Sequence, residues 1–577
     1  MRPIHIHLEV SDPRAHRLTS TLHLTDHEGG PIEFFLPTWI PGSYLIREFA
    51  RFVEEVRAWN EDQTFPVHKV AKNRWRIEGI PEGEIRFSMT VLAADWDLRG
   101  TWAGERDLFV NGTHIFPFPV DQLARKGTLT IDLPEEWEVF CALDAGHAPR
   151  SWRFYNYDDL VDNPILAGPN LDTIEFTIDG IPHTIVVDGK GAPSAEDLLE
   201  GVSQIVRNHA QRFDGLPYPR YYFLLLVGDR RGGGLEHNNC CALQVSRDTF
   251  VDDTGWDAFW SLVAHEHIHA WLVKRLRPAG LTPYDYENEQ YTPALWVSEG
   301  WTDYLCELTV RQTGLMSRQR WLKSWSERLW KLEQVFGRHV DSLADASRNT
   351  WIKLYRRHAH LHRLSVSYYL KGSVAAWILD IHLRQLTNGQ ASLDGLVCRM
   401  MREFPLEKGG FPVGAELEAV GQWLAELSVE SDLGERVRTW VRQTGDLPID
   451  ETLSLLGLER TASPNLGASL GVRLAPNSTI VRSVEPGGPA EDAGIEPDDE
   501  LVAWDHHKLD RPGLDRRLKS AKPLSEVTFQ LFRRSWLTEA SITLAPPKPG
   551  EFDLVSVDAP SEAQMTLLAH WAAPEVE

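Results

Sequence analysis

Two histidines four residues apart, inside an otherwise apolar helical pattern, constrain this chain more than any other feature. The segment WDAFWSLVAHEHIHAWLVKRL contains His265, Glu266, His267 and His269. Residues i and i+4 of an α-helix lie on one face, so His265 and His269 can direct imidazole nitrogens at one metal ion. His267 is rotated by about 200° from His265, and we expect it to be structural. The pattern predicts a helix that carries a metal site.

The acidic residue between the histidines adds chemistry to this helix. Glu266 can hold a metal-bound water, which is the HExxH arrangement of zinc metallopeptidases. Chance produces this pattern in roughly one chain of this size in fifteen, and the alternative is a histidine-rich surface helix. The setting argues against that alternative, because large apolar side chains flank the motif and polar groups in a buried helix need partners.

A zinc site needs a third protein ligand and an open position. In common zinc peptidases a glutamate on the following helix fills this role, and the usual spacing would place it at Asn288, a poor ligand. The neighbours Glu287 and Glu289 lie in the polar segment YDYENEQYTP, which indicates a loop. Glu299 is the better candidate, because LWVSEGWTDYL predicts a helix with apolar neighbours. Asp303 shares the face of Glu299; it would bind the far nitrogen of a ligand histidine or, equally, be a simple surface charge.

Two further segments carry residues suited to binding or catalysis. Residues 232–237, GGGLEH, follow the predicted strand YYFLLLVGD. Gly233 and Gly234 would let a substrate backbone approach closely, and Glu236 could bind a substrate ammonium; the alternative is an ordinary hairpin turn. Residues 368–372, YYLKG, open an apolar helix. A tyrosine hydroxyl there could stabilise an oxyanion, although an aromatic pair is more often part of a core.

Composition limits the classes of partner and compartment. The 577 residues contain 59 Lys and Arg against 83 Asp and Glu, a formal net charge of −24, which disfavours nucleic acid and anionic membranes as partners. The sequence contains no run of 18 apolar residues, the length that a membrane-spanning helix needs. The N-terminus has no apolar signal region, and the five cysteines show no C-x-x-C spacing. We therefore expect a cytoplasmic protein with reduced thiols.

The pattern of apolar residues changes along the chain. Residues 1 to about 170 form short, partly alternating runs separated by Gly, Pro, Asn and Asp, which predicts a β-sandwich-like module. Residues from about 254 to 445 are mainly helical in pattern, and the helical segment SYYLKGSVAAWILDIHLRQLTNG ends at Asn388-Gly389, a C-cap signal. Residues 461–468 resemble a linker, β-like segments continue to about 545, and a proline-rich, acidic tail follows.

These segments together resemble the glycyl aminopeptidase family of zinc metallopeptidases, which belongs to the gluzincins. The match spans residues 36 to about 384 and is carried, in the family's order, by LPTWIPGSYLIREFAR, GGGLEH, HEHIHAWLVKRLRP, PYDYENEQYTPALWVSEGWTDYL and SYYLKGSVAAWILDIHLR. The resemblance implies that Glu299 is the third ligand to one Zn²⁺ per chain and that Glu266 is the general base. It also implies that Tyr369 stabilises the transition state and that Glu236 recognises the free N-terminus of a peptide.

The C-terminal part resembles bacterial PDZ domains, with GGPAEDAGI as the short helix and turn. Residues 469–472, SLGV, would be the loop that binds a peptide C-terminus, and Asp498 stands where the usual turn has glycine. A module that packs over the cleft without binding peptide is at least an equal interpretation.

The predicted architecture is multidomain α+β. It comprises an N-terminal β-sandwich-like domain (1–172), a thermolysin-like catalytic domain with a helical lobe (173–455), a PDZ domain (456–547) and a C-terminal tail (548–577). The predicted function is removal of N-terminal residues from peptides, with small first residues, Gly or Ala, preferred by family analogy. The alternatives are a zinc endopeptidase of the same mechanism, in which Glu236 is structural, and a peptide-binding protein without turnover.

Overall fold

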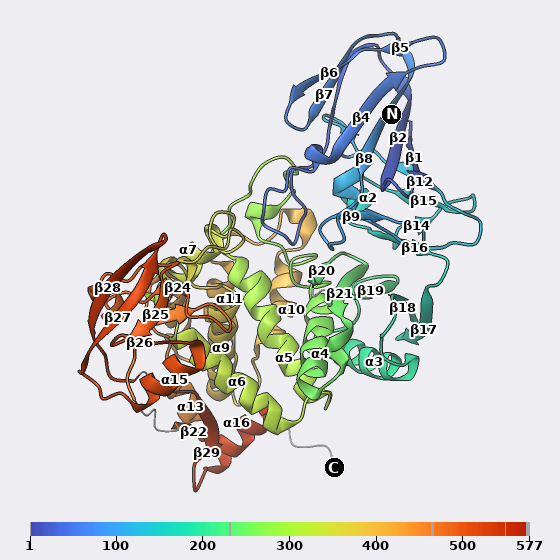
Figure 1. The fold of residues 1–577 in the computed structure, drawn as a ribbon. Coiled ribbons are helices and arrows are strands. Elements are labelled where there is room, and N and C mark those ends of the chain that lie inside the picture. The colour runs from blue at the N-terminus through green and yellow to red at the C-terminus, as the bar shows by residue number, and fades with distance from the viewer. Residues whose placement is uncertain (1, 230–231, 463–466, 548–549, 573–577) are drawn as a thin grey trace. The chain divides into compact units, whose positions relative to one another are not determined.

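The computed structural model describes residues 2–229, 232–462, 467–547 and 550–572 (Figure 1). The chain forms two compact units. The first contains residues 1–292, 302–316 and 394–419, and the second contains residues 293–301, 317–393 and 420–577. The predicted linker at 461–468 falls partly on residues 463–466, outside the described residues. Within the described part of the chain, no helix is long and apolar enough to cross a membrane.

The N-terminal part of the first unit is built from three β-sheets. In β1 (Ile4–Asp12) buried and exposed side chains alternate, as expected for a strand with one face on a core. The largest sheet has the order β14-β15-β12-β1-β2-β8-β4-β5. Its other strands are β2 (Arg17–His27), β4 (Val53–Trp59), β5 (Thr64–Phe65), β8 (Gly83–Leu92), β12 (Gly127–Asp132), β14 (Asp144–Ala145) and β15 (Ser151–Phe154). The predicted β-rich N-terminal domain is confirmed.

Two four-stranded sheets complete this part. One has the order β11-β3-β7-β6, from β3 (Gly30–Phe35), β6 (Val67–Ala71), β7 (Arg74–Ile80) and β11 (Phe118–Pro119). The other has the order β13-β16-β10-β9, from β9 (Thr101–Ala103), β10 (Leu108–Val110), β13 (Glu138–Phe140) and β16 (Ile165–Gly168). Short connections include η1 (Phe49–Phe52), α1 (Gly112–Ile115) and α2 (Tyr157–Val161).

A five-stranded sheet positions the candidate site within the same unit. Its order is β17-β18-β19-β21-β20, from β17 (Asp172–Ile178), β18 (Ile181–Asp188), β19 (Tyr221–Gly228), β20 (Gly233–Glu236) and β21 (Cys240–Ser246). Strands β18, β19 and β21 are parallel, and β20 runs antiparallel to β21 at the edge. The glycine-rich motif is therefore an edge strand, with one side unpaired within the sheet.

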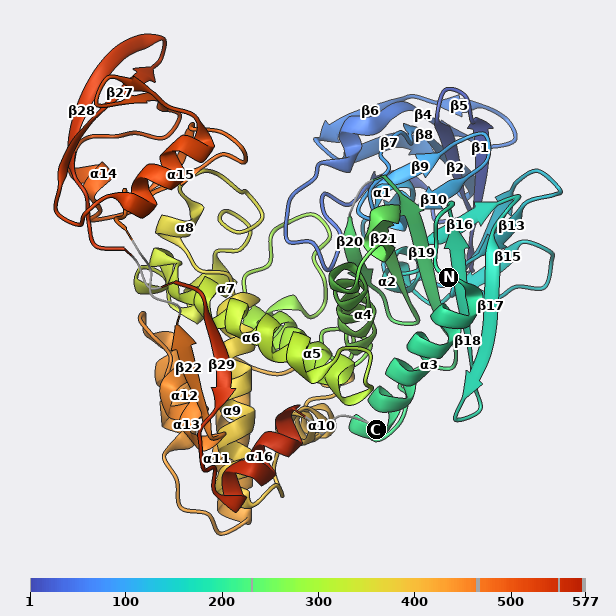
Figure 2. The ribbon, with the colours of Figure 1, turned by 60° about the horizontal axis from the view of Figure 1, so that its bottom comes forward.

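Three helices of the first unit pack together next to this sheet, the first two against the sheet itself and the third against those two helices (Figure 2). They are α3 (Ala195–Arg212), α4 (Asp253–Ile268) and α5 (Thr302–Gln312). The side chains of Ser194 and Asp252 accept backbone N–H groups at the start of α3 and α4, which satisfies donors that a helix leaves unpaired. Helix α4 packs against both β20 and α5, so the histidine helix lies between the glycine-rich strand and the helix that follows Glu299 in the chain. Short 3₁₀ segments, η2 (Arg247–Phe250) and η3 (Ala279–Leu281), flank α4 in sequence.

The second unit contains the helical lobe and the PDZ domain. Its helices include η4 (Trp296–Trp301, a π-helix), α6 (Arg318–Glu333), η5 (Phe336–His339), α7 (Leu343–Arg348), α8 (Leu361–Leu364), α9 (Leu370–Thr387), α12 (Leu433–Arg442) and α13 (Ile449–Leu455). Helices α10 (Leu393–Glu403) and α11 (Ala415–Glu426), with η6 (Leu406–Lys408) between them, follow α9 in the chain, and residues 394–419 of this stretch belong to the first unit. Helix α9 ends as predicted, because Asn388 and Gly389 take left-handed φ angles of 50° and 80°.

The PDZ domain has its own apolar core around Leu501, Leu514 and Phe529. Its elements are β23 (Val472–Leu474), β24 (Val481–Val484), α14 (Pro489–Asp492), β25 (Glu500–Trp504), β26 (His507–Lys508), α15 (Arg511–Ser520), β27 (Glu526–Arg533) and β28 (Trp536–Thr543). Asp498 has a φ of 71°, which aspartate tolerates better than most residues, so it can replace the usual glycine in this turn.

The chain that follows the PDZ domain returns to the helical lobe. Strand β29 (Phe552–Ser556) pairs antiparallel with β22 (Leu458–Ala462), which precedes the PDZ domain (Figure 2). Helix α16 (Glu562–Ala572) then places Trp571 among Trp321, Trp325 and Trp377, with ring centroids 4.3 to 5.6 Å away. The described part of the predicted tail thus contributes a strand and a helix to the lobe. The PDZ domain is inserted between the two paired strands.

We expect Trp571→Ala to destabilise the helical lobe by about 3–5 kcal/mol, because it removes a side chain that is only 1% exposed and leaves a cavity among three indoles. Trp536→Ala is the matched control, since that indole is 80% exposed, and it should change stability by less than about 0.5 kcal/mol. Urea unfolding followed by circular dichroism measures both. Equal midpoints for the two variants would contradict the assignment of α16 to the core of the lobe.

Candidate metal centre and catalytic site

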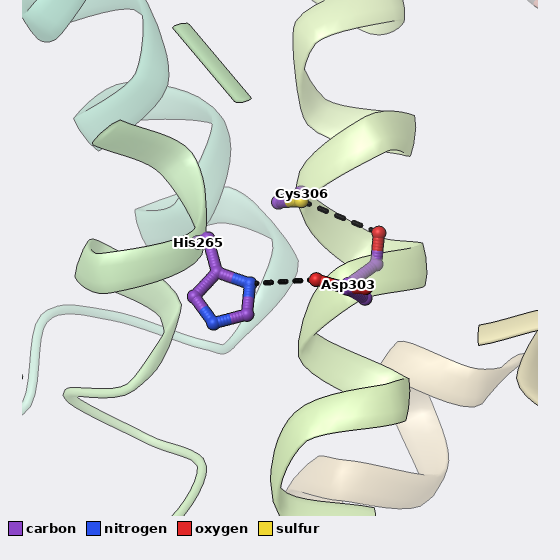
Figure 3. A group of neighbouring side chains, drawn as sticks. All are labelled: His265, Asp303 and Cys306. Carbon is purple, nitrogen blue, oxygen red and sulfur yellow. Dashed lines mark hydrogen bonds and ion pairs between the residues drawn. The ribbon is translucent and has the colours of Figure 1, made fainter. Parts of the chain in front are cut away.

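Helix α4 presents two imidazole rings whose hydrogen bonds define their tautomers. His265 Nδ1 lies 3.0 Å from a carboxylate oxygen of Asp303, and His269 Nδ1 lies 3.3 Å from the carbonyl oxygen of Leu272 (Figure 3 shows the first pair). Both oxygens accept hydrogen bonds, so both Nδ1 atoms carry the proton. In the neutral rings each Nε2 then has a lone pair.

These two lone pairs face each other. The Nε2 atoms of His265 and His269 are 3.0 Å apart. Two nitrogens bound at about 2.05 Å to a tetrahedral ion would be separated by about 3.3 Å, so the observed pair fits two ligands of one metal ion. Without a cation the lone pairs would repel each other in a largely buried site. The donor set of this helix therefore suits a metal.

Cys306 lies near the same histidine and is a less suitable ligand. Its Sγ donates to the backbone carbonyl of Asp303 at 3.3 Å, and His265, Asp303 and Cys306 place ligand atoms within 4.8 Å of one another (Figure 3). Burial raises the pKa of the Cys306 thiol to about 12, and the thiol is already engaged as a donor to that carbonyl oxygen. The interaction of Asp303 with His265 is the one that orients a ligand ring.

Three groups of the first unit converge beside the histidines. Glu236, Glu266 and His269 place side-chain oxygen or nitrogen atoms within 4.8 Å of one another. Glu266 is 5% exposed and Glu236 is 4% exposed. A methyl group added at Gly234 would overlap the carboxyl group of Glu266. The missing side chain at Gly234 is therefore what lets β20 pass directly over the acidic residue of the helix. Gly233 has a φ of 82°, and no atom lies within 4 Å of the position its Cβ would take.

Glu236 is buried with an incomplete set of partners. Its Oε1 atom has no hydrogen-bond partner among the described residues. A buried carboxylate oxygen without a partner is unfavourable by several kcal/mol unless a cation or donor arrives. This atom is thus placed to receive a positively charged group from a ligand.

A buried ion pair next to Glu236 escaped the sequence analysis. Lys274 Nζ lies 2.7 Å from Asp162, which also accepts the backbone N–H of Asn238 at 2.9 Å and lies 3.2 Å from His237 Nδ1. Burial alone would raise the pKa of Asp162, but Lys274 and His237 lower it well below its usual range. Burial lowers the pKa of Lys274, yet Asp162 and, more weakly, Glu236 raise it above its usual value. The charged pair fixes the end of β20.

The glycine strand is also held from the N-terminal sheets. Arg99 donates to the carbonyl oxygen of Gly232 at 2.6 Å and to that of Gly234 at 2.8 Å. Only the tertiary structure identifies Arg99 and Asp162 as partners of this strand, since both lie more than 70 residues before it in the sequence. Nothing in their local sequence distinguishes them from surface charges.

His267 lies on the far side of the histidine helix. It is fully buried, and its ring nitrogens lie 2.7 Å from His209 Nδ1 and 2.6 Å from the hydroxyl of Tyr218. Burial holds the pKa of His267 well below its usual value, so the ring is neutral at physiological pH. It anchors α4 to its neighbours.

Glu299 and Tyr369 belong to the second unit and lie near each other there. Glu299 is 2% exposed on η4. A Cβ at Gly300 would lie 2.6 Å from the backbone of Gly372, so two glycines allow η4 and α9 to approach closely. Burial and the nearby Glu299 carboxylate raise the pKa of Tyr369 well above its usual value, and its hydroxyl lies 3.3 Å from that of Tyr355. Tyr369 is therefore a protonated donor at neutral pH.

Glu287 and Glu289, the alternatives for the third ligand in the loop, already accept hydrogen bonds from other side chains. Glu287 accepts two hydrogen bonds from Arg74, at 2.5 and 2.7 Å, and one from Asn73 at 3.0 Å. Glu289 accepts a hydrogen bond from the hydroxyl of Tyr291. A carboxylate held in a bidentate arginine pair is a poor candidate for a metal ligand, which leaves Glu299 as the stronger candidate.

Three family models match separate parts of the chain. The Peptidase M61 N-terminal domain matches residues 5–169, the M61 glycyl aminopeptidase model matches residues 258–375, and a PDZ domain model matches residues 467–544. The second match includes His265, Glu266, His269, Glu299 and Tyr369. No curated protein matches the chain.

Solved structures with a similar fold include an aminopeptidase N family protein from Idiomarina loihiensis. It is 26% identical, with a TM-score of 0.90, and the match covers 99% of this chain and 100% of that one. The M1 zinc metallopeptidase from Deinococcus radiodurans is 13% identical with a TM-score of 0.48, and covers 78% of this chain and 95% of its own.

The expected α+β architecture, with a β-rich N-terminal domain, a helical middle region and a C-terminal PDZ domain, is thus confirmed. Both domains typical of the family are present in its order, and the histidine helix lies in the catalytic match. The chain matches the models of both the N-terminal domain and the catalytic domain of the M61 glycyl aminopeptidases, and it is a metalloaminopeptidase with a C-terminal PDZ domain.

Proposed function

We propose that this protein is a zinc aminopeptidase that hydrolyses the first peptide bond of peptides with a free N-terminus. The observation that carries the proposal is the position of Glu236, whose carboxylate lies within 4.8 Å of ligand atoms of Glu266 and His269. The α-nitrogen and the carbonyl carbon of one residue are about 2.5 Å apart. An ammonium bound at Glu236 therefore holds the first carbonyl, and no later one, at the catalytic group.

We propose one Zn²⁺ per chain, held by His265, His269 and Glu299. The facing Nε2 atoms of the histidines support this assignment, as does the burial of Glu299. A bound zinc ion supplies a nucleophilic water at neutral pH and polarises the scissile carbonyl. Asp303 holds the proton on His265 Nδ1 and so keeps the Nε2 lone pair directed at the ion.

The acid–base steps are assigned to Glu266 and Tyr369. Glu266 takes a proton from the attacking water and delivers it to the leaving amine. Burial and Glu299 raise the pKa of Tyr369, so its hydroxyl is protonated. This hydroxyl donates a hydrogen bond to the oxyanion of the tetrahedral intermediate. Glu236 fixes the α-ammonium throughout, in a buried setting where a charge pair is stronger than in water. The preference for small first residues, Gly or Ala, follows from the family resemblance.

For the PDZ domain we propose a packing role in the helical lobe. Arg363 of α8 pairs with Glu491 of α14 at 2.5 Å, and Arg473 donates to the carbonyl oxygen of Gln334 at 3.3 Å. In the loop expected to bind a peptide C-terminus, the N–H of Gly471 is directed at the hydroxyl of Ser469 at 3.3 Å. Binding of peptide C-termini at this loop stays a prediction.

We expect Glu266→Gln to lower kcat on glycyl-, alanyl- and leucyl-anilides by at least about 100-fold, because the general base is lost while the shape is kept. The zinc content, measured by atomic absorption, should not change. The exposed Glu136→Gln serves as the control and should retain wild-type turnover. Turnover by Glu266→Gln at the wild-type rate would remove Glu266 from the mechanism.

The exopeptidase assignment is tested by pairing each anilide with its N-acetyl form. Wild-type protein should cleave only the free amines. Glu236→Ala should lower kcat/KM on free amines by at least about 30-fold, since a buried charge pair between substrate and protein is lost. Equal cleavage of blocked and free substrates would instead establish the endopeptidase, and metal binding without any turnover would favour the peptide-binding alternative.

The role of Asp303 is tested by metal affinity. Asp303→Asn should weaken zinc binding about 10- to 100-fold in a competition titration with a chromophoric chelator, because the His265 ring loses the carboxylate that orients it. Cys306→Ser, at the neighbouring side chain, should leave the affinity within about threefold of wild type, since the Cys306 side chain donates to the backbone carbonyl oxygen of Asp303 and a serine hydroxyl can do the same. The reverse order would make Cys306 a ligand and Asp303 a bystander.

A further inference from the structure

A turn of the N-terminal domain lies against the carboxylate of Glu236. The turn is Ile40-Pro41-Gly42-Ser43, in which the N–H of Ser43 donates to the carbonyl oxygen of Ile40 at 3.1 Å. Pro41 occupies the second position and Gly42 the third, where φ is 88°. Proline followed by a glycine with positive φ is the signature of a type II turn. The local sequence therefore sets the shape of this turn.

The turn is held firmly within the first unit. The indole N–H of Trp39 donates to the carbonyl oxygen of Asp285 at 2.7 Å, and the N–H of Thr38 donates to that of Tyr286 at 2.8 Å. The carbonyl oxygen of Thr38 in turn accepts the N–H groups of Arg47 and Glu48. Because both ends of the loop are fixed, the turn cannot retreat from Glu236 without breaking several buried hydrogen bonds.

No side chain fits at Gly42. A Cβ there would lie 2.5 and 2.7 Å from the two carboxylate oxygens of Glu236. The backbone of Gly42 thus covers one side of the carboxylate. Ligand atoms of Glu266 and His269 lie within 4.8 Å of it. An amine bound to Glu236 must therefore fit between these groups.

The charged side chains near Glu236 favour the binding of one cation at its carboxylate. Lys274 and Asp162 form a pair at 2.7 Å and neutralise each other. Glu236 then contributes an unbalanced negative charge, with Oε1 lacking a partner among the described residues. A primary ammonium supplies both the missing charge and up to three N–H donors.

We propose that the type II turn at residues 40–43 forms the wall of the amine pocket and restricts substrates to peptides with an unsubstituted, primary α-amino group. Gly42 is the specificity-determining residue, because its backbone lies so close to the Glu236 carboxylate that even a Cβ has no room there, which limits the space around an amine bound to that carboxylate. This inference rests on the proposed role of Glu236 in binding the substrate amine and adds to it a limit on the size of that amine.

The wild-type protein provides the first test. Glycyl-anilide and N-methylglycyl-anilide both carry a positive charge at neutral pH and differ by one methyl group on the nitrogen. We expect kcat/KM to be at least tenfold lower for the N-methyl substrate, mainly through KM. N-acetylglycyl-anilide, which has no charge, is the reference for loss of the ammonium. Equal kcat/KM for the glycyl and N-methylglycyl substrates would overturn the proposal.

A pair of matched glycine variants provides the second test. Gly42→Ala should lower kcat/KM on glycyl-anilide at least tenfold. Gly30→Ala is the control in the same domain: its φ of 92° imposes similar backbone strain, but no atom lies within 4 Å of its Cβ position, so activity should stay near wild type. Thermal unfolding of both variants separates strain from displacement of Glu236. Equal activity in the two variants would overturn the proposal.

The failures of the two proposals are distinguishable. If Glu236→Ala retains full aminopeptidase activity, the substrate amine binds elsewhere and the position of Glu236 no longer supports the exopeptidase assignment. If Glu236→Ala is inactive while Gly42→Ala behaves as Gly30→Ala does, amine binding by Glu236 is supported and only the proposed role of the turn is wrong. If Gly42→Ala does not fold, the N-methyl comparison, which uses the unaltered protein, decides.

Discussion

Two imidazole nitrogens with lone pairs directed at one point, 3.0 Å apart, are the constraint on which the first unit depends. Each ring reaches this state because its other nitrogen donates to a fixed acceptor, Asp303 for His265 and the carbonyl oxygen of Leu272 for His269. Such an arrangement is unfavourable in a buried site unless a cation joins the two atoms. Asp303 and the buried contacts of His267 keep the helix and its rings in place for that ion.

Close backbone approaches made possible by glycine recur around the site. Gly234 lets β20 pass over Glu266, Gly300 and Gly372 let η4 meet α9, and Gly42 lets the N-terminal turn cover Glu236. At Gly234 and Gly42 a Cβ would overlap a glutamate carboxyl group, and at Gly300 it would overlap the backbone of α9. Glycine is therefore used here less for flexibility than for the absence of volume. The same reasoning connects the N-terminal β domain to substrate selection.

The polar side chains around Glu236 have partners, whereas its own Oε1 atom has none among the described residues. Lys274 and Asp162 satisfy each other, and Arg99 is occupied by the carbonyl oxygens of β20. The buried carboxylate of Glu236, in addition to that of Asp162, is unfavourable unless a ligand brings a cation. In the proposed function the substrate ammonium is that cation, and a peptide supplies it only when its N-terminus is free.

The sequence by itself determined the elements whose signals are local. The i, i+4 spacing placed His265 and His269 on one face, Asn388 marked a helix end, and alternation predicted the N-terminal strands, because helix and strand periods are properties of consecutive residues. The tertiary structure alone decided that Asp162, Lys274 and Arg99 fix the glycine strand, that the turn at Gly42 covers Glu236, and that Trp571 returns to the helical lobe. These contacts join residues up to 250 positions apart, as with Trp321 and Trp571, and spacing in the sequence carries no record of which loops meet when separate sheets and helices pack.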